Sequence, residues 1–387
     1  MPKIKITEQD LTVAVIPQSD NVVFVPIAVP GDSEVPTFEP TLVTSLAQLT
    51  ALCPEASAQD DGWIIVKRLL ESGLPVLVQG VTALSEVDWT ITGLADKSKY
   101  DIRFLTAGAF EHSVTDSESS PAGLVDDGTN VLMMQCAKLR GDAVALCDHA
   151  STLTTSAEVK AYVGLVGEEG TFGAMFSPWV KFIEGGEEIT LPGSFAFLAA
   201  YALSVLNSNP SWFAVAGAAR GVVPGLVGTT ANFGSYDINI LQGRSTDEND
   251  LDTNEGVAIN PICFVRPFGT LIWGNRTLKD NEGGTTALSF LNVRNLVSEL
   301  KKVLYRTARG LTFEQNSDVL WIKFTSLLYP VLDRMLSGNG IASYRVIKQA
   351  TTAKARLKAS IRIFPIEAVE DFELSVVLED ESTTVTE

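Results

Sequence analysis

Short apolar runs alternate with amphipathic stretches along the first two thirds of the chain. Continuous or period-two apolar patterns predict strands, and apolar residues spaced three to four apart predict helices. The predicted strands cover residues 22–29, 74–79, 101–107, 143–148 and 174–180, and the predicted helices cover residues 46–52, 62–72, 130–139 and 157–166. Because strands and helices alternate, crossover connections and a parallel sheet are favoured. Residues 220–243 are rich in glycine and asparagine and predict a loop with short strands.

The last third has a different order of elements. It predicts an amphipathic helix over residues 293–309, a second helix over residues 318–337 with a kink at Pro330, and then strands over residues 342–348 and 355–363. We therefore expect a mixed α/β and α+β, multidomain chain. A central parallel-type α/β domain is flanked by an N-terminal α/β domain and a C-terminal α+β domain, with an extended arm at each end. The predicted parts are an N-terminal arm (1–20), an N-terminal domain (21–93), a central domain (94–255), a C-terminal domain (256–366) and a C-terminal arm (367–387).

Both ends of the chain carry a strand-like segment with no local partner. The N-terminal segment alternates weakly, and the C-terminal one is largely apolar; they consist of Lys3, Ile4, Lys5, Ile6 and Thr7, and of Phe372, Leu374, Val376, Val377 and Leu378. An orphan strand of this kind is either a frayed terminus or a strand donated to another subunit. For the N-terminal segment the sequence leaves these two readings nearly even.

Composition narrows the class of protein. Hydrophobic residues make up 45% of the chain and charged residues 20%, the balance of a globular protein. No apolar window approaches the ~20 residues of a membrane span, and the N-terminus lacks the pattern of a signal peptide, so we expect a cytoplasmic chain without stable membrane insertion. The four cysteines are scattered, mostly among apolar neighbours, which predicts reduced residues in the core.

Charge is strongly segregated along the sequence. Between Arg294 and Arg362 the chain carries thirteen Lys or Arg against four acids, whereas eight acids and no base come after Arg362. A basic block can bind nucleic acid or an acidic protein partner, including another copy of the chain. The acidic remainder, with a net charge of −27, would repel a polyanion, so we favour the protein partner over nucleic acid.

Four cations near the end of the 293–309 helix form the candidate charged docking face, namely Lys301, Lys302, Arg306 and Arg309. Lys302, Arg306 and Arg309 are spaced at i, i+4 and i+7, so that they share one side of a helix. The alternative is an exposed helix whose C-terminal cations only complement the macrodipole.

Candidate chemistry is sparse. His149 follows Asp148 at the end of a predicted strand, a position where catalytic residues often lie in open sheets. The chain has no Gly-x-Ser-x-Gly motif, which would place a nucleophilic serine in a hydrolase. An α/β hydrolase-like or transferase enzyme using His149 remains the alternative function. Histidines and cysteines do not cluster as zinc ligands, and no glycine-rich loop has phosphate-binding spacing. We expect no cofactor and no metal site, although a weak divalent ion at residues 247–252 stays open.

Four segments in the last third carry a family resemblance. In order and spacing, residues 258–278, 290–297, 311–321 and 331–340 resemble the C-terminal region of contractile tail sheath proteins of phages and related injection particles. The most specific of them reads Leu271-Ile-Trp-Gly-Asn-Arg-Thr-Leu278. The similarity runs more weakly from Val22 to Leu378.

The resemblance implies a structural protein of a virion tail, assembled in the cytoplasm of the bacterial host. Six subunits would form each disc, and discs would stack helically around an inner tail tube, with baseplate and tail terminator proteins as further partners. The arms would reach neighbouring subunits and complete a sheet there. Contraction would drive the tube through the bacterial envelope. Whether the particle is a phage or a tailocin is left open.

Overall fold

The computed structural model describes residues 21–30, 37–55, 61–112, 115–116, 124–125, 128–163, 170–245, 256–281, 284–350 and 356–370. Both predicted orphan strands, residues 3–7 and 372–378, and the acidic run at 247–252 lie outside these ranges. Within them, the helices are all too short or too polar to cross a bilayer. All four cysteines are buried and free, as predicted.

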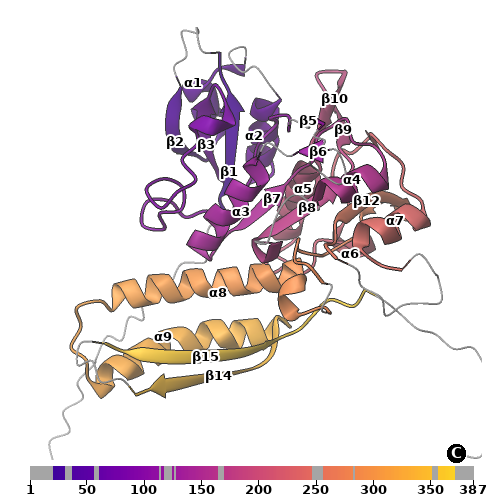
Figure 1. The fold of residues 1–387 in the computed structure, drawn as a ribbon. Coiled ribbons are helices and arrows are strands. Elements are labelled where there is room, and N and C mark those ends of the chain that lie inside the picture. Colours follow the sequence, from indigo (N-terminus) through magenta and orange to yellow (C-terminus); the bar gives the residue numbers. More distant parts are fainter. Residues whose placement is uncertain are drawn as a thin grey trace, which may run out of the picture.

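A large mixed sheet forms the centre of the molecule (Figure 1). Its order is β13-β12-β8-β7-β4-β1-β3-β2. The strands are β1 (Val23–Ala28), β2 (Phe38–Val43), β3 (Val76–Val81), β4 (Phe104–Leu105), β7 (Val144–Cys147), β8 (Gly173–Ser177), β12 (Asn260–Val265) and β13 (Gly269–Ile272). The six inner strands run parallel, and β2 and β13 are antiparallel at the two edges, so the predicted parallel-type centre is confirmed. Strands from before and after the predicted boundaries at residues 93 and 255 belong to this one sheet.

Helices cover both faces of the large sheet because its inner strands are apolar on both sides. Along β1, Val23, Val25 and Ile27 point into one apolar cluster and Phe24 points into the other. The first cluster includes α1 (Leu46–Leu52), α2 (Gly62–Glu71) and α5 (Gly193–Leu206). The second includes α3 (Thr129–Arg140), α4 (Ser156–Val163) and α7 (Ser235–Gln242). We call this sheet with its helices, over described residues 21–281, the body.

The body's smaller elements depart most from the sequence predictions. The predicted loop at 220–243 contains α7, preceded by α6 (Gly217–Arg220) and β11 (Gly228–Thr229). Tertiary contacts hold α7, since Leu241 is buried and Asp237 accepts a hydrogen bond from Ser156 of α4. The predicted strand at 174–180 is interrupted at Pro178 and continues as β9 (Val180–Glu184), which pairs with β10 (Glu187–Leu191) and β11.

The C-terminal unit, residues 284–366, is a separate layered arrangement of α8 (Leu291–Gly310), α9 (Asp318–Ser337), β14 (Ile341–Gln349) and β15 (Lys358–Pro365). In Figure 1 α8 lies between the body and α9, with the hairpin of β14 and β15 on the far side. A third apolar cluster, including Leu300, Leu328 and Leu332, joins the two helices and the hairpin. The remaining elements are β5 (Thr115–Asp116), β6 (Leu124–Val125), η2 (Leu84–Glu86), η3 (Gly170–Phe172) and η4 (Ala287–Ser289).

Candidate intersubunit surfaces

The β14–β15 hairpin is a sheet with two open edges. Its strands pair antiparallel from Ile341–Pro365 to Gln349–Lys358, and among the described residues no third strand joins either of them. Tyr344, Val346 and Ile361 pack inward onto the third apolar cluster. Packing against α9 stabilises this two-stranded sheet, and the unpaired amides and carbonyls along its edges are a template for an added strand.

The outward face of this hairpin is basic. Arg345 and Arg362 are directly opposite each other across the strands, and both are exposed, as is Lys358 nearby. None of the three makes an ion pair with any described residue. Like charges directly opposite each other are destabilising, so this face is suited to an anionic partner. Charge counting included these residues in the basic block, but only the alternation of strand 342–348 could have placed Arg345 outward.

The cations of the predicted docking face on α8 differ in burial and in their partners. Lys302 is only 2% exposed, and its Nζ lies 2.6 Å from Oδ1 of Asp101, which also pairs with Arg306. Burial lowers the pKa of Lys302 to about 8 despite Asp101. Lys301 lies over the ring of Phe172, while Arg309 at the end of α8 is exposed.

Asp101 is therefore a fixed counter-charge at the joint between the body and the C-terminal unit. Burial alone would raise the pKa of its carboxyl, but Lys302 and Arg306 outweigh burial and hold that pKa below its usual value. Lys302 and Arg306 thus pair within the chain, and Lys301 and Arg309 are the exposed cations of the predicted face.

A second ion pair at this joint is fully enclosed. The side chains of Arg103, just before β4, and Glu299 of α8 are 1% and 2% exposed and form a direct ion pair. Nearby, Asn275 and Asn292 exchange two hydrogen bonds, with Nδ2 of Asn275 donating to Oδ1 of Asn292 at 2.8 Å. Buried polar groups therefore link the body to α8 at this joint.

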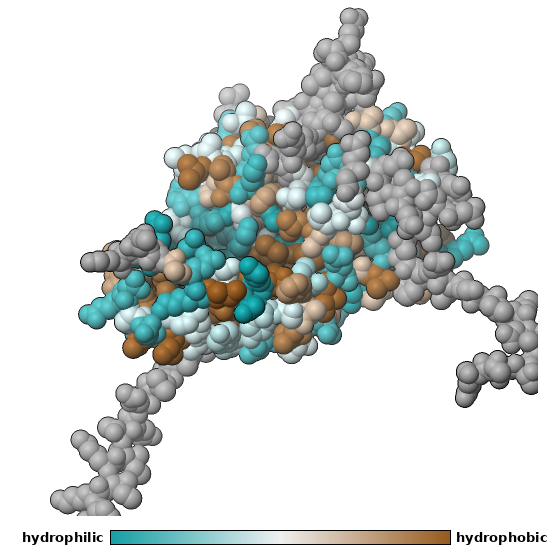
Figure 2. Space-filling view, turned by 60° about the horizontal axis from the view of Figure 1, so that its bottom comes forward, coloured by the Kyte–Doolittle hydropathy of each residue, from teal (hydrophilic) through white to brown (hydrophobic). Residues whose placement is uncertain are grey.

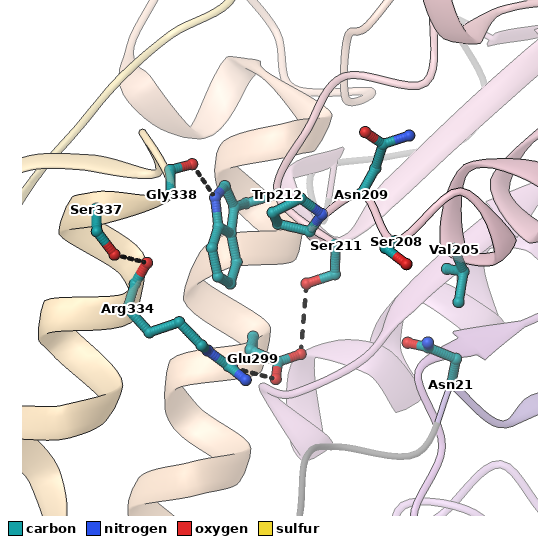
Figure 3. Close-up of a pocket in the computed structure, with 11 residues that line it drawn as sticks. Asn21, Val205, Ser208, Asn209, Ser211, Trp212, Glu299, Arg334, Ser337 and Gly338 are labelled. Carbon is teal, nitrogen blue, oxygen red and sulfur yellow. Dashed lines mark hydrogen bonds and ion pairs between the residues drawn. The ribbon is translucent and has the colours of Figure 1, made fainter.

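A half-open cavity of about 540 Å³ lies beside this pair (Figure 3). Glu299 forms its floor, where it accepts a hydrogen bond from Ser211, and Arg334 of α9 reaches toward the same carboxylate at 3.7 Å. Across the cavity, Trp212 donates from its indole to the carbonyl of Gly338 at 3.0 Å. The cavity is therefore a polar gap between the two units.

Removal of Glu299 is expected to weaken the joint strongly. Glu299→Ala leaves Arg103 buried without its counter-ion, which costs about 3–5 kcal/mol of unfolding free energy. Urea unfolding measures this loss. The matched control is Glu314→Ala, whose partner Lys323 is half exposed, so that its loss costs less than about 1 kcal/mol. Equal losses in the two variants would contradict the assignment.

His149 has no access to solvent. Its side chain is 0% exposed, Nδ1 lies 2.8 Å from the carbonyl oxygen of Ala150, and Nε2 lies 2.9 Å from Oγ of Ser177. Since a carbonyl only accepts, Nδ1 carries the proton and Nε2 accepts from Ser177. Asp148 turns elsewhere and accepts from the amide and hydroxyl of Ser194 at the start of α5. The carboxylate, imidazole and hydroxyl therefore do not form one relay.

The two buried groups respond to pH in opposite directions. Burial lowers the pKa of His149 to about 4, so the folded state resists its protonation and loses stability as pH falls from 6.5. Burial raises the pKa of Asp148 to about 6, so the folded state takes up that proton more readily and gains stability as pH falls through 6. In the wild-type chain these effects offset each other.

Replacement of His149 should reveal its contribution to the pH dependence of stability. The His149→Gln variant lacks the imidazole, so the stability gap between wild type and variant should shrink by about 2.5 kcal/mol from about pH 7.5 to about pH 4.5. Chemical denaturation at the two pH values measures the gap. A gap independent of pH would show that His149 titrates as an ordinary exposed histidine.

Apolar side chains are also exposed on the C-terminal unit. Figure 2 views the molecule with this side turned forward and shows brown apolar atoms among teal hydrophilic ones. On α9, Val319, Ile322, Tyr329 and Leu336 are exposed and fall within one stripe of the helix. Phe364 and Ile366 are exposed at the end of β15. Apolar surface gathered on one side marks a region of protein contact.

Comparison with known proteins gives a match in structure only. No family model and no curated protein matches the sequence. A chain of an extracellular contractile injection system, the PVC sheath complex in the contracted state, is similar with a TM-score of 0.68 and 18% identity, covering 99% of each chain.

Two structures of the anti-feeding prophage are also similar in fold. Its helical sheath in the contracted state matches with a TM-score of 0.64 and 15% identity, and its baseplate, six-fold symmetrised, with a TM-score of 0.65 and 14% identity. Each covers 98% of this chain and 99% of its own. The chain therefore has the fold of the sheath proteins of contractile injection systems.

Proposed function

We propose that the chain is the structural subunit of a contractile tail sheath. It polymerises as stacked hexameric rings around an inner tube and contracts to drive that tube through the bacterial envelope. The observation that carries this proposal is the fold, which matches a contracted sheath complex over 99% of both chains. The six-fold symmetry of the similar baseplate supports rings of six.

The subunits are joined by exchanged strands. Residues 3–7 and 372–378 add to the open edges of β14 and β15 in neighbouring copies, which satisfies backbone groups that the hairpin leaves unpaired. Charge supports the C-terminal exchange. The acids beyond Arg362 complement the outward face of Arg345, Lys358 and Arg362, and this attraction acts over a Debye length of about 8 Å at physiological salt.

The tube or a neighbouring subunit meets the α8 face. Arg309 offers an exposed charge there, and Lys301, Lys302 and Arg306 complete the proposed docking face around it. The apolar stripe of α9 adds area that a partner would bury.

Contraction then changes the packing between rigid subunits rather than their internal fold. Such a transition needs two alternative interfaces and persistent links between copies. Exchanged arms supply the links, and baseplate and tail terminator proteins set the two ends of the polymer. The assembled particle is a virion tail built in the host cytoplasm.

Negative-stain electron microscopy of the purified protein tests this function. Hollow striated cylinders are expected, and discrete globules at high protein concentration would contradict it. The enzyme alternative makes a different prediction, in which His149→Ala abolishes an activity and leaves assembly unchanged. The enclosed environment of His149 does not favour that outcome.

A further inference from the structure

The segment after β15 returns to the body instead of leaving the hairpin freely. The amide of Ile366 donates to the carbonyl of Gly340 at 3.1 Å. Four residues later, Glu370 accepts hydrogen bonds from Nε and Nη2 of Arg276 at 2.9 and 2.6 Å. Nη2 of Arg244 approaches the same carboxylate at 3.1 Å. The last described residue of the chain is thus held by two arginines of the body.

Arg276 is also held in place by contacts that do not involve Glu370. Its side chain is 9% exposed and its guanidinium lies over the ring of Phe290 at 4.5 Å. Its backbone amide donates to Oδ1 of Asn260, whose Nδ2 donates back to the Arg276 carbonyl. A planar guanidinium with two donors on one carboxylate gives a fixed direction as well as attraction.

The position of Glu370 matters because the predicted C-terminal strand begins only two residues beyond it. A strand at 372–378 that continued directly from Pro365 would be separated from β15 by only residues 366–371. At six residues, this connection is slightly longer than the two to five residues of common hairpin loops. The strand's nearest acceptor would then be the open edge of its own β15, and local pairing is favoured by the low cost of closing a short loop.

We propose that Glu370, Arg276 and Arg244 form a clamp that keeps the C-terminal strand off its own hairpin and directs it to a neighbouring copy. The clamp draws residues 366–370 to the body and so prevents them from serving as a hairpin turn. Arg276 is a positioning residue in this role. The inference rests on the proposed strand exchange. It assigns Arg276, at the end of the segment Trp273-Gly-Asn-Arg276, the role of holding the Glu370 carboxylate.

The clamp is tested with Glu370→Gln and Arg276→Gln in the full chain. Glu367→Gln is the matched control, because Glu367 lies in the same segment and is exposed. Hydrogen exchange on the dilute monomer reports the open edge of β15. We expect that edge to exchange at least tenfold more slowly in both clamp variants, because their own C-terminal strand covers it, and to stay fast in wild type and control.

A deletion distinguishes pairing of the C-terminal strand with its own β15 from a general loosening of the hairpin. Removal of residues 371–387 from the Glu370→Gln variant should restore fast exchange on β15. Unchanged exchange in Glu370→Gln, or slow exchange that survives the deletion, would overturn the proposal.

Assembly gives an independent readout. Clamp variants should place at least tenfold fewer subunits in cylinders than wild type and control do. If wild type forms no cylinders, the proposed sheath function fails, and the exchange measurement still decides the clamp. Cylinders formed equally well by all variants would show that the clamp has no role in assembly.

Discussion

Removal of residues 371–387 is expected to leave a folded monomer that no longer builds long tubes, and removal of residues 1–10 should do the same. The three apolar clusters are built from residues that neither deletion removes, as far as the described part of the chain gives them, so the melting temperature should change little. Each deletion takes away one proposed exchanged strand. Open edges of the hairpin then stay unpaired, and contacts between copies lose their backbone hydrogen bonds.

Thermal melts, sedimentation and negative-stain microscopy measure these outcomes together. Removal of residues 382–387 alone is the matched control, since it spares the strand at 372–378. We expect the control to form tubes of wild-type length. Normal tubes from both longer truncations would defeat strand exchange, whereas an unfolded product would place the deleted residues in the core of their own chain.

Charge reversal on the hairpin should have the second largest effect. Arg345→Glu places a carboxylate directly opposite Arg362, where two arginines now face each other. The isolated chain should be equally stable or gain about 0.2–1 kcal/mol from the new cross-strand pair. Assembly should fall sharply, because the outward face loses most of its positive charge while the acidic arm is unchanged.

Salt dependence separates this effect from a packing defect. Wild-type assembly should weaken as ionic strength rises, and assembly of the variant should respond less, because less attraction remains to be screened. Lys99→Glu makes the same charge change at an exposed position of the body and should assemble as wild type. Equal losses in both variants would mean that net charge matters and the hairpin face does not.

Local sequence signals predicted the elements that have clear ends. The helix at 318–337 is observed with those bounds, since Ser317 precedes it and Gly338 follows it. Ser45 caps α1, with its side chain accepting from the Gln48 amide. The strand predicted at 101–107 shrinks to β4, because Asp101 and Arg103 turn to the C-terminal unit. Such distant contacts leave no periodic pattern in the sequence.

The candidate contact surfaces were also predicted only where the signal is local in the sequence. Counting charges found the basic block, but helical spacing placed Lys302 on an outer face. Its burial depends on Asp101, 201 residues earlier in the chain. Nothing local indicates that Glu370 meets Arg276 across 94 residues. The open edges of β14 and β15 depend on the sheet order, which pattern alone does not give.

A density map of the assembled protein by cryo-electron microscopy tests the central claim most directly. The account predicts that β14 and β15 are flanked by strands from two other copies, with residues 3–7 and 372–378 in that density. A map in which both termini fold onto their own subunit and the hairpin edges stay bare would contradict it.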